Sequence, residues 1–211
     1  MTRLSACRDC PRLAAFLDEV RVAHPGYFAA PVPPFGDPEP SLLIVGLAPG
    51  LHGANRTGRP FTGDHAGILL YQTLHDFGFA TGPESVSADD PLRLITCRIT
   101  NAVKCLPPAN KPEPAEIRAC NRHLAGELAT LSSVRVILAL GLVAHKAVLM
   151  ALGLKASSLE FGHGARHELA DGRVLFDSYH CSRYNTQTRR LTPESFAQVF
   201  TTIREELDSP R

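Results

Sequence analysis

Four short stretches of the sequence consist mostly of apolar residues. They cover residues 41–47, 92–99, 134–140 and 174–178, and they include the runs LLIVGL and VRVILAL. Continuous apolar runs of this length are typical of strands that are buried on both faces of a parallel sheet. We therefore expect four strands in the interior of the protein.

Apolar positions recur with a helical period between these runs. Predicted helices cover residues 11–22, 66–77, 114–131, 143–152 and 193–207, and Pro193 after Thr192 suits the start of the last one. Strands that alternate with helices predict an α/β fold, a three-layer αβα sandwich with a central four-stranded, mostly parallel sheet. Five prolines between residues 31 and 40 indicate an extended arm that wraps the domain, so we expect one domain over residues 1–211.

Composition and charge narrow the possible classes of protein. The 22 lysines and arginines nearly balance the 21 aspartates and glutamates, for a net charge of +1, which excludes a polycationic tail that binds nucleic acid by charge alone. No apolar run reaches the ~18–20 residues of a membrane span, and the first residues lack the apolar stretch of a signal peptide. We expect an intracellular protein with no membrane partner, and a monomer.

Four of the six cysteines have the spacing of a metal site. Cys7 and Cys10 form a C-x-x-C pair, and Cys105 and Cys120 flank a loop that has four prolines between residues 107 and 114. A C-x-x-C loop directs two thiolates at one centre, and a proline-stiffened loop can fix the direction of the others. These residues predict a four-cysteine metal site, which on spacing alone suits zinc or an iron–sulfur cluster.

The other two cysteines have no such pattern. Cys97 lies in an apolar run and is expected to be a buried small residue. Cys181 follows His180, but adjacent residues on an extended chain point to opposite faces, which does not suit proton transfer between them. We expect no nucleophilic role for Cys181.

Polar and glycine-rich residues follow each predicted strand. The loop after the first strand contains Gly46, Pro49, Gly50, Asn55, Arg56, Arg59, Phe61 and Asp64. The second strand is followed by Asn101, the third by Gly141 and the fourth by His180. Ligands of open α/β sheets bind beyond the carboxyl ends of the strands, so these residues predict one cleft. Arg56, Arg59, Arg183, Arg189 and Arg190 would give it a basic rim that suits a phosphate backbone.

Each of these residues also has a purely structural interpretation. Asp64 could cap the helix that starts near residue 66, and Phe61 could belong to the core. Asn101 could close a turn, and His180 could be an ordinary surface histidine. A functional cleft is favoured because all four fall at one edge of the sheet.

Three motifs together resemble the uracil-DNA glycosylase superfamily, and most closely its family 5, the type B enzymes. The first is YFAAPVPPFGDPEPSLLIVGLAPGLHGANRTGRPFTGDHAG at residues 27–67, the second is TNAVKC at 100–105, and the third is HCSRYNTQ at 180–187. The four cysteines are similar to the [4Fe-4S] cluster ligands of families 4 and 5. The resemblance implies a cluster that ties down the N-terminal segment, and a nucleoid-associated repair enzyme.

The resemblance also implies roles for individual residues. A deaminated base would be flipped out of DNA, because a stacked base cannot be reached, and its N-glycosidic bond would be hydrolysed. Phe61 would stack on the base, Asn101 would hydrogen-bond its polar edge, and His180 would stabilise charge on the pyrimidine O2. The pocket would be completed by Gly46, Ala48, Pro49, Gly50 and Asn55, and the DNA backbone would meet Arg56, Arg59, Gly141, Ser182, Arg183 and Asn185.

The chain departs from its relatives at two places. Other families carry a carboxylate or amide just after the first glycine of the opening motif, where this chain has Leu47 and Ala48. This difference is the type B pattern. It directs attention to Asp64 as the residue that positions water or stabilises the sugar cation. Cys181 replaces a proline.

Type B enzymes accept uracil, hypoxanthine, xanthine and some modified pyrimidines. The alternatives are a strictly uracil-specific family 4 enzyme and a non-catalytic module that binds DNA lesions.

Overall fold

The computed structural model describes residues 4–210, and helices and strands alternate along the chain. The helices are η1 (Leu4–Ala6), α1 (Pro11–Ala23), α2 (Ala54–Thr57), α3 (His65–Asp76), η2 (Pro108–Asn110), α4 (Pro114–Thr130), α5 (Leu142–Ala151), α6 (Arg183–Gln187) and α7 (Pro193–Asp208). The strands are β1 (Phe35–Gly36), β2 (Leu42–Gly46), β3 (Cys97–Asn101), β4 (Val136–Leu140), β5 (Arg166–Glu168) and β6 (Val174–Ser178).

These strands form one sheet in the order β1-β3-β2-β4-β6-β5. The four inner strands run parallel to one another, and the short edge strands β1 and β5 pair antiparallel to their neighbours. The carboxyl ends of β2, β3, β4 and β6 therefore lie at the same edge of the sheet, where the loops that follow them meet.

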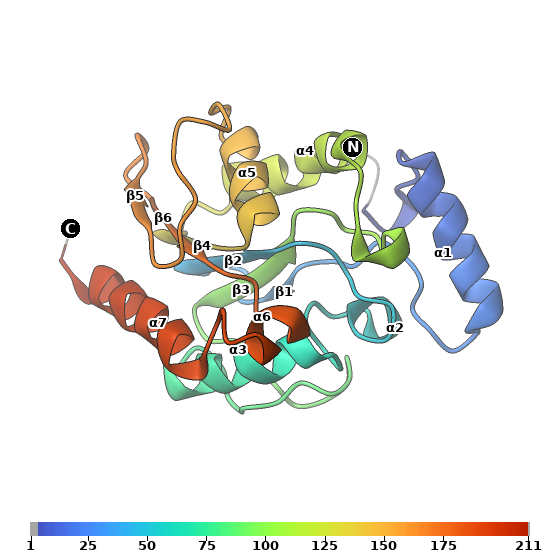
Figure 1. Ribbon diagram of the computed structural model, residues 1–211, viewed down its shortest axis with the longest axis horizontal. Coiled ribbons are helices and arrows are strands. Elements are labelled where there is room, and N and C mark those ends of the chain that lie inside the picture. Colours follow the sequence, from blue (N-terminus) through green and yellow to red (C-terminus); the bar gives the residue numbers. More distant parts are fainter. Residues whose placement is uncertain (1–3, 211) are drawn as a thin grey trace.

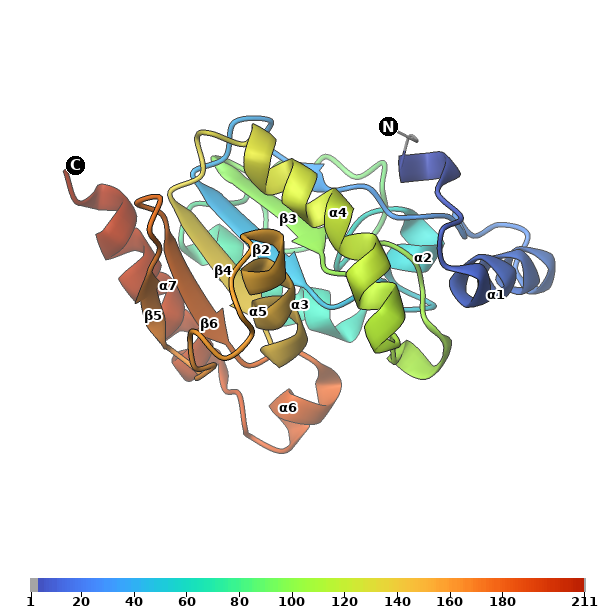
Figure 2. The ribbon, with the colours of Figure 1, turned by 90° about the horizontal axis from the view of Figure 1, so that it is seen from above.

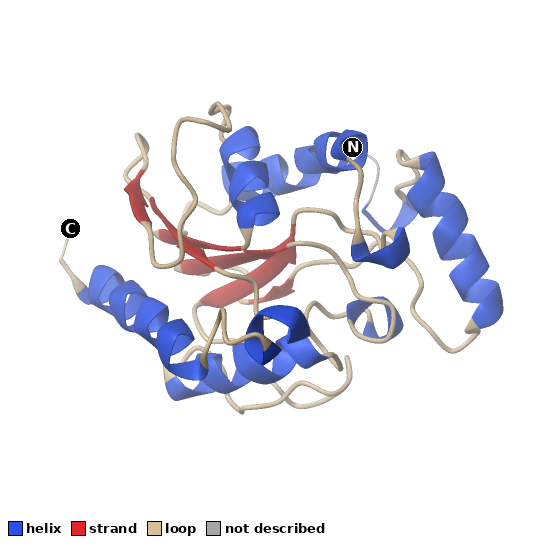
Figure 3. Ribbon diagram, viewed as in Figure 1, coloured by secondary structure: helices blue, strands red, loops and turns tan. Residues whose placement is uncertain are grey.

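Helices cover both faces of this sheet and make three layers (Figures 1 and 3). Alternate strand residues enter different cores: Leu42 and Ile44 pack in the cluster that includes residues of α3 and α7, whereas Leu43 and Val45 pack with residues of α4 and α5. Seen from above, α4 and α5 lie across one face of the sheet (Figure 2). The α/β sandwich expected from the continuous apolar runs is confirmed.

The sheet has six strands, not the four that the sequence predicts. The two additional strands are the edges, which have only two and three residues, and β5 consists of Arg166, His167 and Glu168. Segments this short carry no apolar run, so the hydrophobic pattern could not reveal them. Within residues 31–40, the expected extended arm supplies β1.

The second predicted strand is shifted along the chain. Residues 92–99 were expected to be extended, but β3 begins only at Cys97 and continues to Asn101. Thr96 adopts a left-handed backbone conformation with φ of 49°, which breaks the apolar run, and Leu94 instead forms an isolated bridge to Ala80. Asn101 is therefore the last residue of the strand and not part of the following loop.

The five predicted helices are present, with ends that differ by at most a residue. Thr192 caps α7 by accepting a hydrogen bond at Oγ1 from the amide of Ser195, as expected for a threonine before Pro193. The short helices α2 and α6 lie within the predicted loops. Among the described helices, none combines the length and the apolar character that crossing a lipid bilayer requires.

Candidate active site and cysteine cluster

The ends of β2 and β3 place Gly46 directly beside Asn101, its partner in the parallel register. The two chains stay together past the strand ends, because Ala102 N–H donates to Gly46 O at 2.9 Å and Val103 N–H donates to Leu47 O at 3.0 Å. The backbone on both sides of Asn101 is thus fixed, and its side chain is held at the sheet edge.

Gly46 leaves the room that Asn101 and Phe61 occupy. A Cβ atom at this position would lie 2.4 Å from Asn101 Oδ1 and 2.6 Å from Phe61 Cζ, distances far inside van der Waals contact. The glycine therefore allows the amide and the ring to meet over the end of β2. Its role is to leave space, and it makes no contact through a side chain.

Phe61 and His180 stack at this edge of the sheet. Their ring centroids are 5.8 Å apart with an angle of 27° between the planes. Phe61 has a left-handed φ of 55°, and a Cβ on Gly67 would lie 1.8 Å from its carbonyl oxygen, so Gly67 permits this backbone turn. A planar ring held in this way offers a platform for another flat group.

His180 is kept neutral and is held by its backbone. Burial lowers the pKa of its imidazole to about 4, so the ring carries no charge near neutral pH. Asn185 Nδ2 donates to His180 O at 2.8 Å, and Gly141 N–H donates to Ser178 O at 2.8 Å two residues earlier. A neutral imidazole can donate a hydrogen bond to an oxygen on which negative charge develops.

Asn101 has a buried oxygen with no partner. The residue is 3% exposed, and its Oδ1 atom makes no hydrogen bond within residues 4–210. A buried acceptor without a donor costs about 1–3 kcal/mol, so it marks a position where a ligand donor is expected. An N–H group on a bound molecule would satisfy it.

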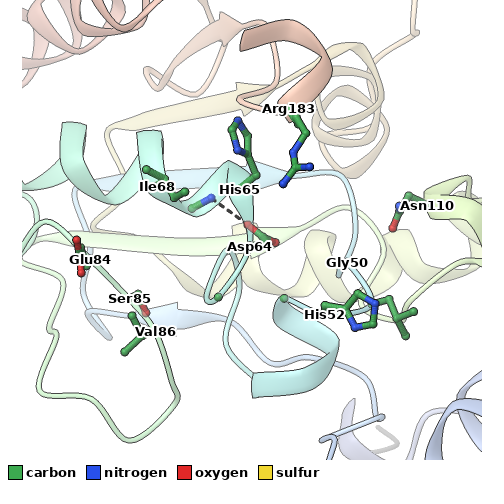
Figure 4. A pocket seen from close by; sticks show the side chains of 14 residues that line it. Gly50, His52, Asp64, His65, Ile68, Glu84, Ser85, Val86, Asn110 and Arg183 are labelled. Atoms are coloured by element: carbon green, nitrogen blue, oxygen red, sulfur yellow. Dashed lines mark hydrogen bonds between the residues drawn. The ribbon is translucent and has the colours of Figure 1, made fainter. Parts of the chain in front are cut away.

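Asp64 caps a helix, which is one of the two roles that the sequence suggested. It is the N-cap of α3, and Oδ1 accepts a hydrogen bond from Gly67 N–H at 2.9 Å, the dashed line in Figure 4. Its Oδ2 atom faces Gly50 and Gly53, where a Cβ would lie 3.7 and 2.4 Å away. Burial raises the pKa of this carboxyl above its ordinary value, against the smaller opposing effect of the backbone hydrogen bonds. One oxygen caps the helix, and the other is left for the cavity.

Two adjoining cavities of about 390 and 690 Å³ meet at Asp64. The smaller one is lined by Leu47, Ala48, Gly50, Ala54, Phe61, Asp64, His65, Ala66, Asn101, Asn110, His180, Ser182 and Arg183. The larger one shares Gly50, Asp64, His65, Asn110 and Arg183 with it. The structure therefore brings together Asp64, Asn101 and His180, the three residues that the sequence selected for catalysis.

Asn110 and His65 line both cavities and were not predicted. Asn110 reaches the cavity from the side opposite Asp64 (Figure 4). It lies in the proline-rich loop, which the sequence analysis treated only as a support for the cysteines. Both Ala109 and Asn110 are left-handed, with φ of 53° and 56°, a conformation that asparagine tolerates better than most residues. The sequence signal that could have indicated this cavity residue was the presence of an asparagine within the proline-rich loop.

The predicted basic rim is only partly present. Arg56 and Arg183 are exposed, and Arg183 lines both cavities. Arg59 is 7% exposed, however, with its guanidinium paired to Asp90, bonded to Ser85 Oγ at 3.1 Å and placed over the Phe35 ring. The prediction that Arg59 meets a DNA phosphate is wrong, because its charge is already neutralised inside the protein.

Other predicted contacts also differ from expectation. Asn55 is 0% exposed and, like the buried Pro49, does not belong to the lining of either cavity, so neither meets a ligand there. Ser182 caps α6, and the Asn185 amide holds the His180 carbonyl. Asn185 is therefore a positioning residue for His180 in this structure. Cys97 is 0% exposed, which confirms its expected burial, and Cys181 is 0% exposed as well.

The four predicted ligand cysteines line a single cavity between η1, α1 and α4. Burial, with the nearby Cys120 and Glu116, raises the pKa of Cys10 to about 11, and burial with the same neighbouring thiols raises that of Cys105 to about 12. Lys104 N–H donates to Cys120 Sγ at 3.2 Å. Thiols gathered in this way ionise only when a cation is bound among them.

All four candidate ligands that line this cavity are thiols. Thiolates alone hold an iron–sulfur cluster, and four thiolates also suit zinc, so the donor set fits either centre.

Comparison with known proteins identifies the family of this chain. A family model described as the uracil DNA glycosylase superfamily matches residues 33–204. A type-5 uracil-DNA glycosylase of Thermus thermophilus is 54% identical over 93% of this chain and 91% of the relative, and one of Pyrobaculum aerophilum is 42% identical over 94% and 88%. A type-4 uracil-DNA glycosylase of P. aerophilum is 36% identical over 61% of the chain and 58% of the relative.

The chain belongs to the uracil DNA glycosylase superfamily. Within it the chain is a uracil-DNA glycosylase of the type-5 branch, a DNA repair enzyme, because the type-5 relatives match nearly the whole chain. This membership confirms the family that the three motifs indicated.

Proposed function

We propose that this enzyme excises uracil, hypoxanthine and xanthine from DNA and leaves an abasic site. The observation that carries this proposal is the buried Oδ1 atom of Asn101, which has no donor although it lies beside the stacked rings of Phe61 and His180. A base that enters this pocket can offer the missing donor.

Deaminated bases share the polar edge that one amide can recognise. Uracil and hypoxanthine each present a carbonyl next to a ring N–H, and xanthine does the same, whereas cytosine and adenine present an amino group next to a ring acceptor. Asn101 would accept from the ring N–H and donate to the adjacent carbonyl. The rest of the smaller cavity is largely apolar around Leu47, Ala48, Ala54 and Ala66, so ring size is not read by further hydrogen bonds.

Bond cleavage would proceed through charge separation between sugar and base. The flipped base stacks on Phe61, and neutral His180 donates a hydrogen bond to the oxygen that gains negative charge. The free oxygen of Asp64 accepts a hydrogen bond from water and directs it at the positively charged sugar carbon. Arg56 and Arg183, both exposed beside the cavities, bind the phosphates that flank the flipped nucleotide.

A single-turnover assay tests this substrate range. Duplex oligonucleotides with one uracil or one hypoxanthine are incubated with excess enzyme, and alkali reveals abasic sites. We expect excision of both bases, and a loss of about 10–100-fold on both with Asn101→Ala, because the base edge loses its hydrogen bonds to the amide. Excision of uracil alone would contradict the broad range. An unchanged rate in Asn101→Ala would contradict the role of the amide.

We also propose that Cys7, Cys10, Cys105 and Cys120 hold a [4Fe-4S] cluster. When bound, the cluster would join η1 and α1 to the loop before α4, and we see its role as structural. Cys105 is four residues from Asn101, and buried Lys104 between them donates from Nζ to Glu127 Oε1 of α4 at 2.6 Å. The cluster would thus fix the chain that carries Asn101 as well as the N-terminal segment.

Substitution of one ligand tests the cluster. We expect Cys120→Ala to lose bound iron, the brown absorbance and most of the soluble yield. Cys97→Ala is the matched control, because Cys97 is also buried but lies apart from the cysteine cavity, and it should retain about the same iron per chain. Iron assay and visible spectroscopy measure both. A stable Cys120→Ala protein with full iron would show that the four cysteines are not the ligands.

The last proposal concerns the domain organisation, the oligomeric state and the location of the protein. We propose that residues 1–211 act as one domain, as a monomer associated with the nucleoid, where its substrate lies. Sedimentation at micromolar concentration would test the monomer, with a dimer mass as the contradicting result.

A further inference from the structure

A second group of metal-ligand residues lies away from the active-site cavities and the cysteine cluster. His145 of α5, His167 of β5 and Asp177 of β6 each offer one ligand atom, and these three atoms all lie within 4.8 Å of one another. In the described part of the chain, this is the one group of three or more such residues with that spacing. Two members come from the neighbouring strands β5 and β6, and the third comes from α5, 22 residues before His167.

The group is buried and tightly arranged. His145 Nδ1 lies 2.8 Å from Asp177 Oδ1, and His167 Nε2 lies 3.2 Å from Asp177 Oδ2. The Asp177 side chain is fully buried, that of His145 is 1% exposed, and that of His167 is 14% exposed. Within residues 4–210, Asp177 forms no ion pair with a lysine or arginine, so a buried carboxylate has only histidines to offset its charge.

The second nitrogen of His145 is already held. Nε2 lies 3.1 Å from Leu159 O, an acceptor that requires a proton on this nitrogen. Nδ1 then either carries a second proton, which makes the ring a cation beside Asp177, or presents its lone pair to a metal ion. Metal-binding histidines are usually oriented by a bond from the other ring N–H to a carboxylate, a backbone carbonyl or water, and here the acceptor is a backbone carbonyl.

We propose that His145, His167 and Asp177 bind one zinc ion. Two imidazoles and a carboxylate are donors that zinc accepts, with a water molecule in the fourth position of a tetrahedron. Binding replaces the Nδ1 proton of His145, which leaves to solvent, and the partly exposed side of His167 provides the path for the ion. The zinc would join the edge strand β5 and helix α5 to β6, the strand that leads to His180.

Zinc binding is tested on protein whose iron content has been measured. The protein is dialysed against micromolar zinc and then against zinc-free buffer, and metals are determined by elemental analysis. We expect one zinc per chain, no loss of iron, and a higher unfolding temperature in the presence of zinc. His167→Asn, on a partly exposed edge strand, should bind zinc at least tenfold more weakly and lose the temperature shift. Asp177→Asn provides a second variant with nearly the same shape.

A surface histidine serves as the control. His75→Asn alters an exposed histidine outside the group and should bind zinc as the unaltered protein does. Absence of retained zinc would overturn the proposal and leave the group as a hydrogen-bonded ion pair. Retention of the same amount by His167→Asn would overturn it as well. Neither outcome depends on excision activity, so the result is independent of the proposed substrate range.

Discussion

Asp64→Asn is expected to lower the single-turnover rate of uracil excision at pH 7 by about 10²–10⁴-fold, the usual range for a lost general base. Asparagine caps helices about as well as aspartate, so the hydrogen bond to Gly67 N–H and the fold of α3 should persist. The amide cannot accept a proton from water or offset a positive charge on the sugar. Binding of a uracil duplex, measured by fluorescence anisotropy, should change by no more than about threefold.

Asp64→Ala separates the capping role from the chemical one. This variant also removes the cap, which costs about 1 kcal/mol of stability, whereas Asp64→Asn should leave the unfolding temperature nearly unchanged. An equal loss of DNA binding and rate in Asp64→Asn would contradict a chemical role. It would make helix capping the sole role of this residue.

The pH dependence of the rate should follow Asp64. Because burial raises the pKa of its carboxyl, the ionised form is lost at a higher pH than for an ordinary aspartate, and the rate should fall on acidification from there. Asp64→Asn should remove this fall.

His180, with a pKa lowered from 6.5 to about 4, should add no titration near pH 6.5. Its effect is on stability instead: the unfolded chain binds the proton first, so stability decreases as the pH falls from 6.5 toward 4.

Gly46→Ala is expected to reduce uracil excision by at least about 100-fold, with the protein still folded. The new methyl group would meet Asn101 Oδ1 at 2.4 Å and Phe61 Cζ at 2.6 Å, so both side chains must move by about 1 Å or more. Displacement of this size at reacting groups costs about two orders of magnitude in rate. Single-turnover rates together with circular dichroism spectra measure the effect.

Gly26→Ala is the matched control, because a Cβ there meets no atom within 4 Å. It should excise uracil at the rate of the unaltered protein. Full activity in Gly46→Ala would show that Asn101 and Phe61 need not lie over the end of β2, and the proposed base pocket would be wrong.

The inner strands β2 and β4 were predictable because burial on both faces favours apolar side chains at every position. Edge strands carry no such requirement: the residues of β5 are exposed or only partly buried, and their pairing with β6 depends on backbone hydrogen bonds that any sequence can make. The start of β3 was missed for a different reason. Thr96 gives no sign in the sequence that its backbone turns to the left-handed region.

Site residues that follow the inner strands were predictable because parallel strands end at the same edge of the sheet. Phe61, Asp64, Asn101 and His180 line one cavity as expected. Arg59 was assigned wrongly because its partner Asp90 lies 31 residues later, in a loop whose path no local pattern reveals. Asn110 was missed because only the folded chain brings the proline-rich loop against the cavity.

The brevity of β1 and β5 has a consequence for behaviour at high protein concentration. A long exposed edge strand offers unpaired backbone groups to a strand of another molecule and so promotes aggregation. Here the edges span two and three residues, and the edge that β5 forms carries the charged side chains of Arg166 and Glu168. The edge strands thereby shield the four inner strands, which contain the apolar runs of the chain, from pairing with other molecules. The folded enzyme should therefore resist β-type aggregation when concentrated.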